Sequence, residues 1–144
     1  MKIKQILYYK RVLDALSTIG SCDRAKAAAI IVRDKCIIST GVNGAPRGLE
    51  HCDDSGHIMK DNHCLRTVHA EVNAILMAAK NGININNTNM YCLFKPCYNC
   101  TKSIINSGIK NVYYFYDYKD DFQKYFEKNN CTKFKKIGGK KWEK

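Results

Sequence analysis

The sequence predicts a three-layer α-β-α sandwich in which helices cover both faces of a central mixed five-stranded sheet. Short apolar runs typical of strands alternate with segments of helical periodicity in the second half of the chain. A strand-turn-strand pattern, which indicates an antiparallel pair, comes before them. The chain of 144 residues shows no repeat and no linker-like stretch. We therefore expect one α/β domain over residues 1–144.

Apolar periodicity and turn-forming residues place the individual elements. In chain order we expect a helix at 3–19, a β-hairpin from 27–32 and 36–40, a loop at 41–48, a helix at 68–80, a strand at 90–94, a helix from Pro96 to Ser107, a strand at 112–116, a helix at 120–128 and an edge strand at 133–137. Pro96 at the first turn and Gly108 just past the last turn match the usual preferences of helix ends. Residues 129–144 are rich in lysine, and we expect a frayed, basic tail after the edge strand.

The chain contains eight cysteines, which is many for its length. A secreted disulfide scaffold is one interpretation, but the N-terminus lacks an apolar segment followed by a cleavage site. No apolar run approaches the ~20 residues that span a bilayer. We therefore expect a cytoplasmic protein without a membrane partner, whose cysteines are metal ligands or buried apolar residues. Cys36 and Cys92 lie in strand-like runs and are predicted to be core residues.

The formal net charge is +11, from 24 lysines and arginines against 13 acidic residues. A basic surface attracts phosphorylated small molecules and nucleic acids alike. The charge alone therefore leaves both classes of partner open.

Two short motifs carry the chemistry. The tripeptide His69-Ala70-Glu71 stands at the start of one predicted helix, and the stretch Pro96 to Cys100 stands at the start of another. A catalytic zinc takes three protein ligands and keeps one position open for water. We expect Cys97 and Cys100, on the first turn of their helix, to bind one zinc ion together with His69. Glu71 would then lie near the open position and transfer protons without binding the metal.

A lone Cys-x-x-Cys also occurs in structural zinc sites and in redox pairs. A closed structural site would need a fourth ligand, and a redox pair would leave His69 and Glu71 unexplained. The combination of His-x-Glu with Pro-Cys-x-x-Cys about 25 residues later is the signature of zinc deaminases. The sequence therefore predicts a zinc-dependent deaminase in which Glu71 is the catalytic acid and base.

Beyond these motifs, the chain resembles the deoxycytidylate (dCMP) deaminases of the cytidine deaminase superfamily, most closely those of the bacterial competence-operon type. The resemblance spans about residues 21–120 and is carried by Ser21 to Arg24, Ile30 to Lys35, Asn43-Gly44, His51-Cys52, Asp61 to Thr67, His69 to Ile75, Pro96 to Cys100, Ser107 to Lys110 and Asp117 to Lys119. The whole superfamily shares the zinc motif. The Asn43-Gly44 loop, the insert with His51-Cys52 and the late Asp-Tyr pair are more specific.

This resemblance implies a cytidine-deaminase-like fold and the hydrolysis of dCMP to dUMP and ammonia, which supplies the precursor of dTMP. It also implies that Asn43 contacts the sugar and that Tyr118 approaches the phosphate or lines the pocket. Arg24 and Lys26 precede a predicted strand near that pocket and are candidate phosphate ligands, although solvated surface charges would show the same pattern. By the same resemblance we expect a homo-oligomer, either a dimer or a hexamer, rather than a nucleic-acid complex.

Two departures from the family pattern concern regulation. Many of the resembling proteins are controlled by dCTP and dTTP, bound with magnesium. They often have Gly-Tyr-Asn-Gly where this chain has Gly41 to Gly44, with Val42 in place of the aromatic residue, and Val-Gly-Ala where it has Ala27 to Ala29. The resemblance therefore leaves effector control of this chain open.

A second metal site is predicted in the polar stretch 49–66 and the residues near it. This region holds six soft ligands: Cys22, His51, Cys52, His57, His63 and Cys64. A polar segment without periodicity can be ordered by a four-ligand structural zinc. The resembling proteins carry a cysteine where this chain has His57, and histidine for cysteine preserves a ligand. We expect the ligands to be Cys22, Cys52, His57 and Cys64; the alternative is a loop with free thiols.

Two other functions remain as alternatives. A tRNA adenosine deaminase would use the same zinc chemistry and would suit the positive charge, but that family typically reads Glu-Pro-Cys where this chain has Lys95-Pro96-Cys97. The other is a non-catalytic module that binds nucleic acid or takes part in DNA uptake. Retention of Glu71 argues against the module, because a purely structural zinc scaffold does not need that carboxylate.

Overall fold

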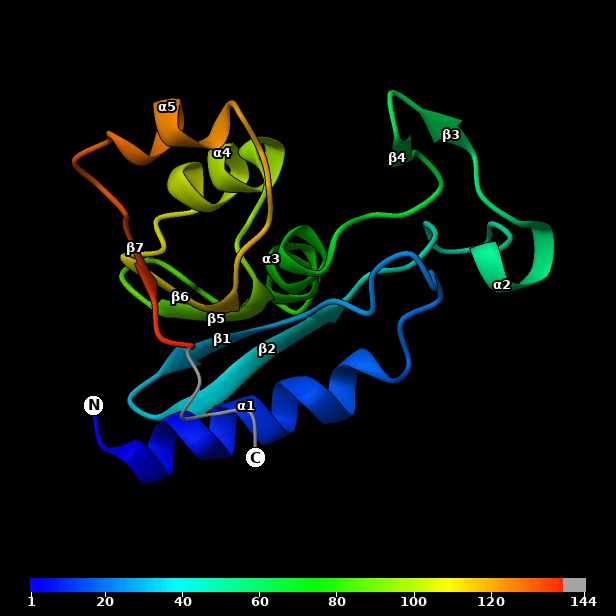
Figure 1. The fold of residues 1–144 in the computed structure, drawn as a ribbon. Helices are drawn as coiled ribbons and strands as arrows, with labels where there is room; N and C mark the ends of the chain where they lie inside the picture. The colour runs from blue at the N-terminus through cyan, green and yellow to red at the C-terminus, as the bar shows by residue number, and fades with distance from the viewer. Residues whose placement is uncertain (139–144) are drawn as a thin grey trace.

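The computed structural model describes residues 1–138, and Figure 1 shows its arrangement. Its elements in chain order are α1 (Ile3–Ser17), β1 (Ala28–Arg33), β2 (Cys36–Val42), α2 (Cys52–Ser55), β3 (Met59–Lys60), β4 (His63–Cys64), α3 (Ala70–Lys80), β5 (Asn89–Phe94), α4 (Tyr98–Asn106), β6 (Asn111–Tyr116), α5 (Gln123–Glu127) and β7 (Lys133–Lys136). Five of the strands within the described range form one sheet in the order β2-β1-β5-β6-β7.

The sheet is mixed, as the sequence predicts. Strand β1 pairs antiparallel with both β2 and β5, whereas β5, β6 and β7 run parallel to one another. The two parallel steps are each bridged by a helix, α4 between β5 and β6 and α5 between β6 and β7. The predicted edge strand is confirmed as β7, while the predicted frayed tail lies partly in residues 139–144, outside the described residues.

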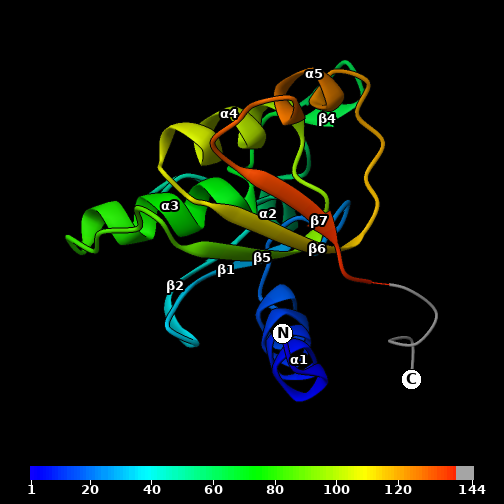
Figure 2. The ribbon, with the colours of Figure 1, turned by 90° about the vertical axis from the view of Figure 1, so that its left-hand side faces the viewer.

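Helices cover both faces of the sheet, so the predicted three-layer sandwich is confirmed (Figure 2). Residues of β1 alternate between the two faces, because successive side chains of a strand point in opposite directions. Ala29 and Ile31 pack with α3 and α4, and Ile30 and Val32 pack with α1. The helices that carry the two zinc motifs, α3 and α4, therefore lie together on one face of the sheet.

The β1-β2 hairpin is closed by Asp34 and Lys35, both with positive φ (49° and 67°), which is typical of a two-residue type I′ turn. Strand β2 continues to Val42, so the predicted loop begins two residues later than expected. Gly41 explains the extension: a Cβ there would lie 2.1 Å from the carbonyl oxygen of Ala70. The glycine lets β2 continue in close contact with the start of α3.

Two other predictions were wrong. Helix α4 begins at Tyr98 and not at Pro96, because Cys97 is the extended N-cap residue (φ −68°, ψ 170°). The expected end is confirmed, since Gly108 adopts φ +82° just beyond the C-cap. Cys92 is buried as expected, but Cys36 is exposed because it directly follows the turn on the edge strand of the sheet.

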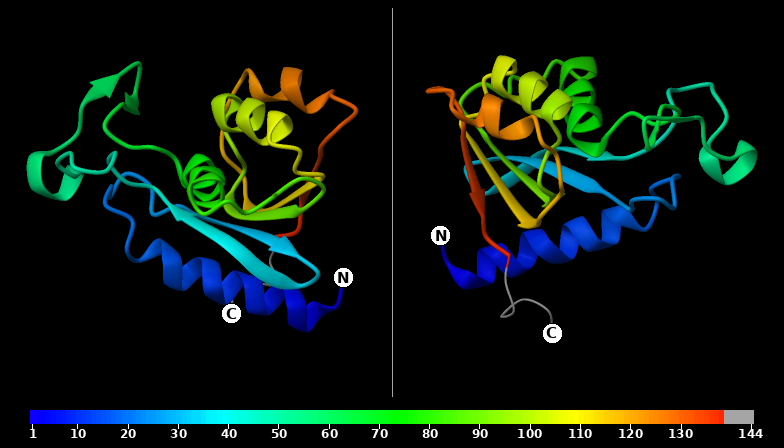
Figure 3. Two further views of the ribbon diagram at one scale, coloured as in Figure 1. Left: turned by 180° about the vertical axis from the view of Figure 1, so that it is seen from behind. Right: turned by 45° about the horizontal axis from the view of Figure 1, so that its top comes forward.

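The polar stretch 49–66 is more structured than expected. It contains the single-turn helix α2 and the small antiparallel pair β3-β4, and it projects from one end of the sandwich (Figure 3). Asp61 and Asn62, both at positive φ, form the turn between its strands. We refer to residues 49–66 as the insert. No helix in residues 1–138 is long and apolar enough to cross a membrane.

Candidate metal centres

The starts of α3 and α4 bring three ligands to one point. His69 is the N-cap residue of α3, Cys97 is the N-cap residue of α4, and Cys100 lies in the first turn of α4. His69 Nδ1 is 3.4 Å from Cys97 Sγ and 3.4 Å from Cys100 Sγ. All three ligand atoms lie within 4.8 Å of one another.

These separations match a zinc ion. Zinc binds sulfur at about 2.3 Å and nitrogen at about 2.0–2.1 Å, which at tetrahedral angles separates the S and N ligands by about 3.5 Å. Within the described residues, the metal-ligand cluster at this point comprises two thiols and one imidazole. This is a set of the kind that holds a catalytic zinc and leaves one position open.

The electrostatics of the centre favour a cation. A hydrogen bond from Cys100 lowers the pKa of Cys97 to about 4, and His69 adds to this effect. The hydrogen bond with Cys97 in turn raises the pKa of His69. Cys97 is therefore a thiolate at neutral pH, which is the form that binds metal.

Glu71 lies inside the centre without being one of its three ligands. Its side chain is buried, and Oε2 is 3.6 Å from Cys100 Sγ. Burial raises the pKa of Glu71, and the neighbouring His69 partly offsets the rise. A carboxyl group whose pKa moves toward neutrality can both accept and donate a proton, as a general acid and base must.

The N-terminus of α4 is held by Asp120, a residue that the sequence analysis did not identify. Asp120 Oδ2 accepts a hydrogen bond from the backbone N–H of Tyr98 (2.7 Å), while Oδ1 accepts one from Phe122 (2.9 Å). Cys97 makes no side-chain capping bond of its own. Asp120 therefore caps the helix from 22 residues away and leaves the Cys97 sulfur free for the metal. A capping bond of such long range has no local sequence signal.

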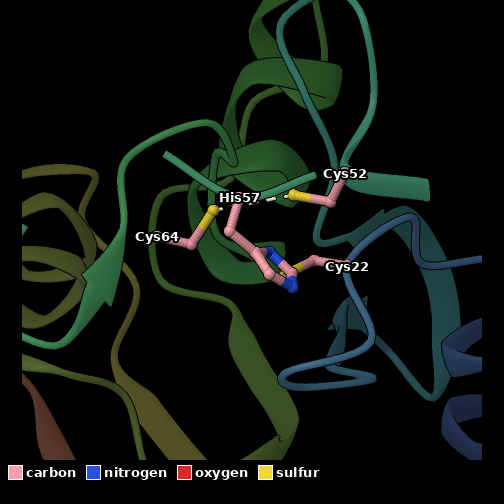
Figure 4. Close-up of side chains that lie close together, drawn as sticks. All are labelled: Cys22, Cys52, His57 and Cys64. Carbon is pink, nitrogen blue, oxygen red and sulfur yellow. Dashed lines mark hydrogen bonds between the residues drawn. The ribbon is translucent and has the colours of Figure 1, made fainter. Parts of the chain in front are cut away.

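A second cluster joins Cys22, Cys52, His57 and Cys64, the four residues that the sequence analysis selects (Figure 4). Their ligand atoms also lie within 4.8 Å of one another. Cys22 Sγ is 3.6 Å from His57 Nδ1, and Cys52 Sγ is 3.6 Å from Cys64 Sγ. Figure 4 shows the side chains converging from the loop after α1 and from three points along the insert. His51 and His63, the other two soft ligands of the region, are not part of the cluster.

One thiol of the second cluster is already suited to bind metal. Burial acts to raise the pKa of Cys64, but hydrogen bonds from the backbone of Arg66 and Ile58 lower it to about 6. A thiol with this pKa is mostly ionised at neutral pH. The donor set of three thiols and one imidazole is typical of closed structural zinc sites.

Asn43 lies beside the first centre and is largely engaged within the protein. It is buried; its Oδ1 accepts a hydrogen bond from Ala27 N (3.0 Å), and its Nδ2 donates one to the carbonyl of Cys22 (3.4 Å). The next residue, Gly44, pairs with Val68, which directly precedes His69. Because an amide nitrogen carries two hydrogens, one N–H of Asn43 remains for another partner.

The three candidate residues for the phosphate lie in different surroundings. Arg24 is exposed, and one guanidinium nitrogen donates to the carbonyl of Asn62 (3.0 Å). Burial raises the pKa of Tyr118, the charges of Cys97 and Asp120 raise it further, and the charge of Arg24 lowers it. Lys26 is exposed and donates to the carbonyl of Gly20 (2.5 Å). Among the described residues, Lys26 forms no hydrogen bond with either cluster.

Sequence comparison shows that the chain is similar to one family model and to several known proteins. The family model for the cytidine and deoxycytidylate deaminase zinc-binding region matches residues 2–116. The chain is 43% identical over 127 residues to ComE operon protein 2 of Bacillus subtilis, an alignment that covers 87% of this chain and 67% of that protein. It is 31% identical over 120 residues to the deoxycytidylate deaminase of Saccharomyces cerevisiae, covering 79% of this chain but only 38% of the yeast protein.

The fold comparison agrees with the sequence comparison. The crystal structure of dCMP deaminase from the cyanophage S-TIM5 in complex with dCMP and dUMP is similar, with a TM-score of 0.82 at 28% identity. The match covers 95% of this chain and 99% of the phage chain. The matched residues include His69, Glu71, Cys97 and Cys100. The chain therefore belongs to the cytidine and deoxycytidylate deaminase family, and it has the α/β fold and the zinc-binding region of that family.

Proposed function

We propose that the protein hydrolyses dCMP to dUMP and ammonia and thereby supplies the precursor for dTMP synthesis. The observation that carries this proposal is the cluster of His69, Cys97 and Cys100 with the buried carboxylate of Glu71 beside it. The similarity to deoxycytidylate deaminases, one of them solved with dCMP and dUMP, supports the choice of substrate.

In this proposal, Glu71 performs the proton transfers. A zinc ion held by His69, Cys97 and Cys100 would supply a water molecule whose pKa is lowered toward neutrality. Glu71 accepts a proton as the water attacks the ring carbon that bears the amino group. It then donates a proton to the adjacent ring nitrogen and assists the departure of ammonia. The burial of Glu71 keeps bulk water away from the carboxylate, and the raised pKa suits both roles.

The nucleotide end of the substrate would be held by residues outside the metal centre. The remaining N–H of Asn43 would donate to a sugar hydroxyl. Arg24 has five N–H donors and uses one nitrogen on Asn62, so the others are available for a phosphate. Tyr118, whose pKa responds to the charges of both Cys97 and Arg24, would line the space between the reacting base and the phosphate. We include Lys26 as a further phosphate ligand through its charge.

We also propose a structural zinc bound by Cys22, Cys52, His57 and Cys64. The separations of 3.6 Å agree with the S···N and S···S distances of about 3.5–3.8 Å in tetrahedral zinc sites. Most of the insert is exposed, and its apolar residues Ile58, Met59 and Leu65 face solvent. Since it buries little apolar surface, a metal is the more effective means of ordering it.

The first test offers the purified protein dCMP, CMP, deoxycytidine and a tRNA anticodon stem-loop in parallel and measures ammonia release. We expect turnover of dCMP with a kcat/KM well above that of the other three, since only dCMP combines a deoxyribose with a phosphate. Activity on the stem-loop alone would overturn the substrate but not the metal centre. Repeating the dCMP assay with dCTP or dTTP and magnesium tests whether these nucleotides are effectors.

The role of Glu71 is tested by Glu71→Gln, which keeps the size of the side chain and removes its proton exchange. We expect kcat for dCMP to fall by about 10²- to 10⁴-fold with the zinc content and dCMP binding retained. Glu50→Gln, on the exposed start of the insert, is the matched control and should keep its activity. Full activity of Glu71→Gln would show that another group transfers the protons.

The role of Arg24 is tested by comparing dCMP with deoxycytidine. Losing a charge-assisted hydrogen bond to the phosphate costs roughly 1.5–3 kcal/mol, so Arg24→Ala should raise KM for dCMP about tenfold or more. The low activity on deoxycytidine should change by less than about twofold, because that substrate has no phosphate. Arg33→Ala removes the same charge from the far end of β1. It controls for the effect of overall positive charge on the binding of a negatively charged nucleotide. Equal losses on both substrates would exclude a phosphate contact.

The structural zinc is tested by metal analysis. We expect two zinc ions per chain in the unmodified protein and one in Cys64→Ser, with increased proteolysis of the insert in the variant because it loses its cross-link. Cys36→Ser changes an exposed cysteine outside both clusters and should keep two ions. A single zinc per chain in the unmodified protein would remove the second site.

A further inference from the structure

We propose that Asp23 is a positioning residue that holds the ring of His57 with Nδ1 toward the three thiols of the second cluster, and so sets the affinity of that cluster for zinc. The inference rests on the structural zinc proposed above. Asp23 is not one of the four ligands. Its contact would allow His57 to act as a zinc ligand.

The contacts of His57 carry the inference. Its Nδ1 is 3.6 Å from Cys22 Sγ, and its Nε2 is 2.9 Å from Asp23 Oδ1. The ring therefore has Nδ1 facing the thiol of Cys22 and Nε2 facing the carboxylate of Asp23, the residue that follows Cys22 in the chain. Figure 4 shows the ring of His57 extending between Cys22 and the other two thiols.

Such a carboxylate has a defined effect on a metal ligand. In a neutral imidazole one nitrogen carries the proton and the other has the free lone pair that binds metal. An acceptor on Nε2 favours the tautomer with the proton there, which leaves Nδ1 free for zinc. Histidine ligands usually donate this second N–H to a carboxylate, carbonyl or water, which also fixes the orientation of the ring.

The contact between Asp23 and His57 is explained less well as an ordinary surface ion pair. The side chain of Asp23 is 76% exposed, and exposed pairs contribute little to stability. The backbone of Asp23 is instead held from both sides. Cys22 is buried in the cluster, and Arg24 donates to the carbonyl of Asn62 at the turn of the insert. These neighbours keep the main chain at Asp23 close to the insert, within reach of Nε2 of His57.

The test measures zinc affinity by titrating metal-free protein against a chromophoric chelator. The unmodified protein should show two zinc sites. The site that is lost in Cys64→Ser is then assigned to the second cluster. We expect Asp23→Asn to weaken that site by about 10- to 100-fold and to leave the other unchanged. Asp53→Asn removes the same charge from an exposed residue of α2 that is not the carboxylate paired with His57, and it should have no effect.

A double-mutant comparison separates orientation of the ring from a general effect of charge. In the background His57→Cys, which replaces the ring with a thiol ligand, Asp23→Asn should change the zinc affinity by less than about twofold. An equal loss with and without the ring, or no loss in Asp23→Asn alone, overturns the proposal. If the unmodified protein binds only one zinc, the structural site itself is absent and the inference fails with it.

A spectroscopic readout does not depend on any variant folding. In the zinc-loaded, unmodified protein, long-range ¹H–¹⁵N correlation of the His57 ring should show metal on Nδ1 and a proton on Nε2. Metal on Nε2 would contradict the role assigned to Asp23.

Discussion

The structure depends on the meeting of two helix starts above one face of the sheet. An N-cap residue has an extended backbone while its side chain folds back toward the first turn, and both His69 and Cys97 occupy that position. At the start of α4, the backbone N–H of Cys100 also favours the thiolate form of Cys97. Because β5 leads into α4 and β2 packs against α3, the sheet fixes the distance between the two starts. The three ligands are therefore positioned by helices that pack on the central sheet.

The insert reaches this rigid part through a short segment after α1. Ser21 and Cys22 contact His51 and His57 of the insert, at 2.7 and 3.6 Å. On its other side, the same segment is bound by Asn43, which accepts a hydrogen bond from Ser21 N and donates one to the carbonyl of Cys22. Order in the insert is in this way connected to the proposed sugar-binding residue. A polar insert without a core is thus connected by direct contacts to Asn43.

The sequence predicted the sandwich and the first centre because both follow from local signals. Strand runs, helix periodicity and the spacing of His69, Cys97 and Cys100 are readable residue by residue. The second cluster was predicted from the density of soft ligands together with the resemblance to related proteins, and the structure brings the same four residues together. Errors occurred where tertiary contacts decide, as at the start of α4, where Cys97 takes the N-cap position. The role of Asp120 could not be predicted, because its capping bond joins residues far apart in the chain.

The most direct test of the account is an anomalous difference map at the zinc edge from crystals of the metal-loaded protein. We predict a peak bonded to His69 Nδ1, Cys97 Sγ and Cys100 Sγ, with the fourth position open and facing Glu71. A peak closed by a fourth protein side chain, or no peak at this point, would contradict it, because the chemistry assigned to Glu71 needs an open position on the metal.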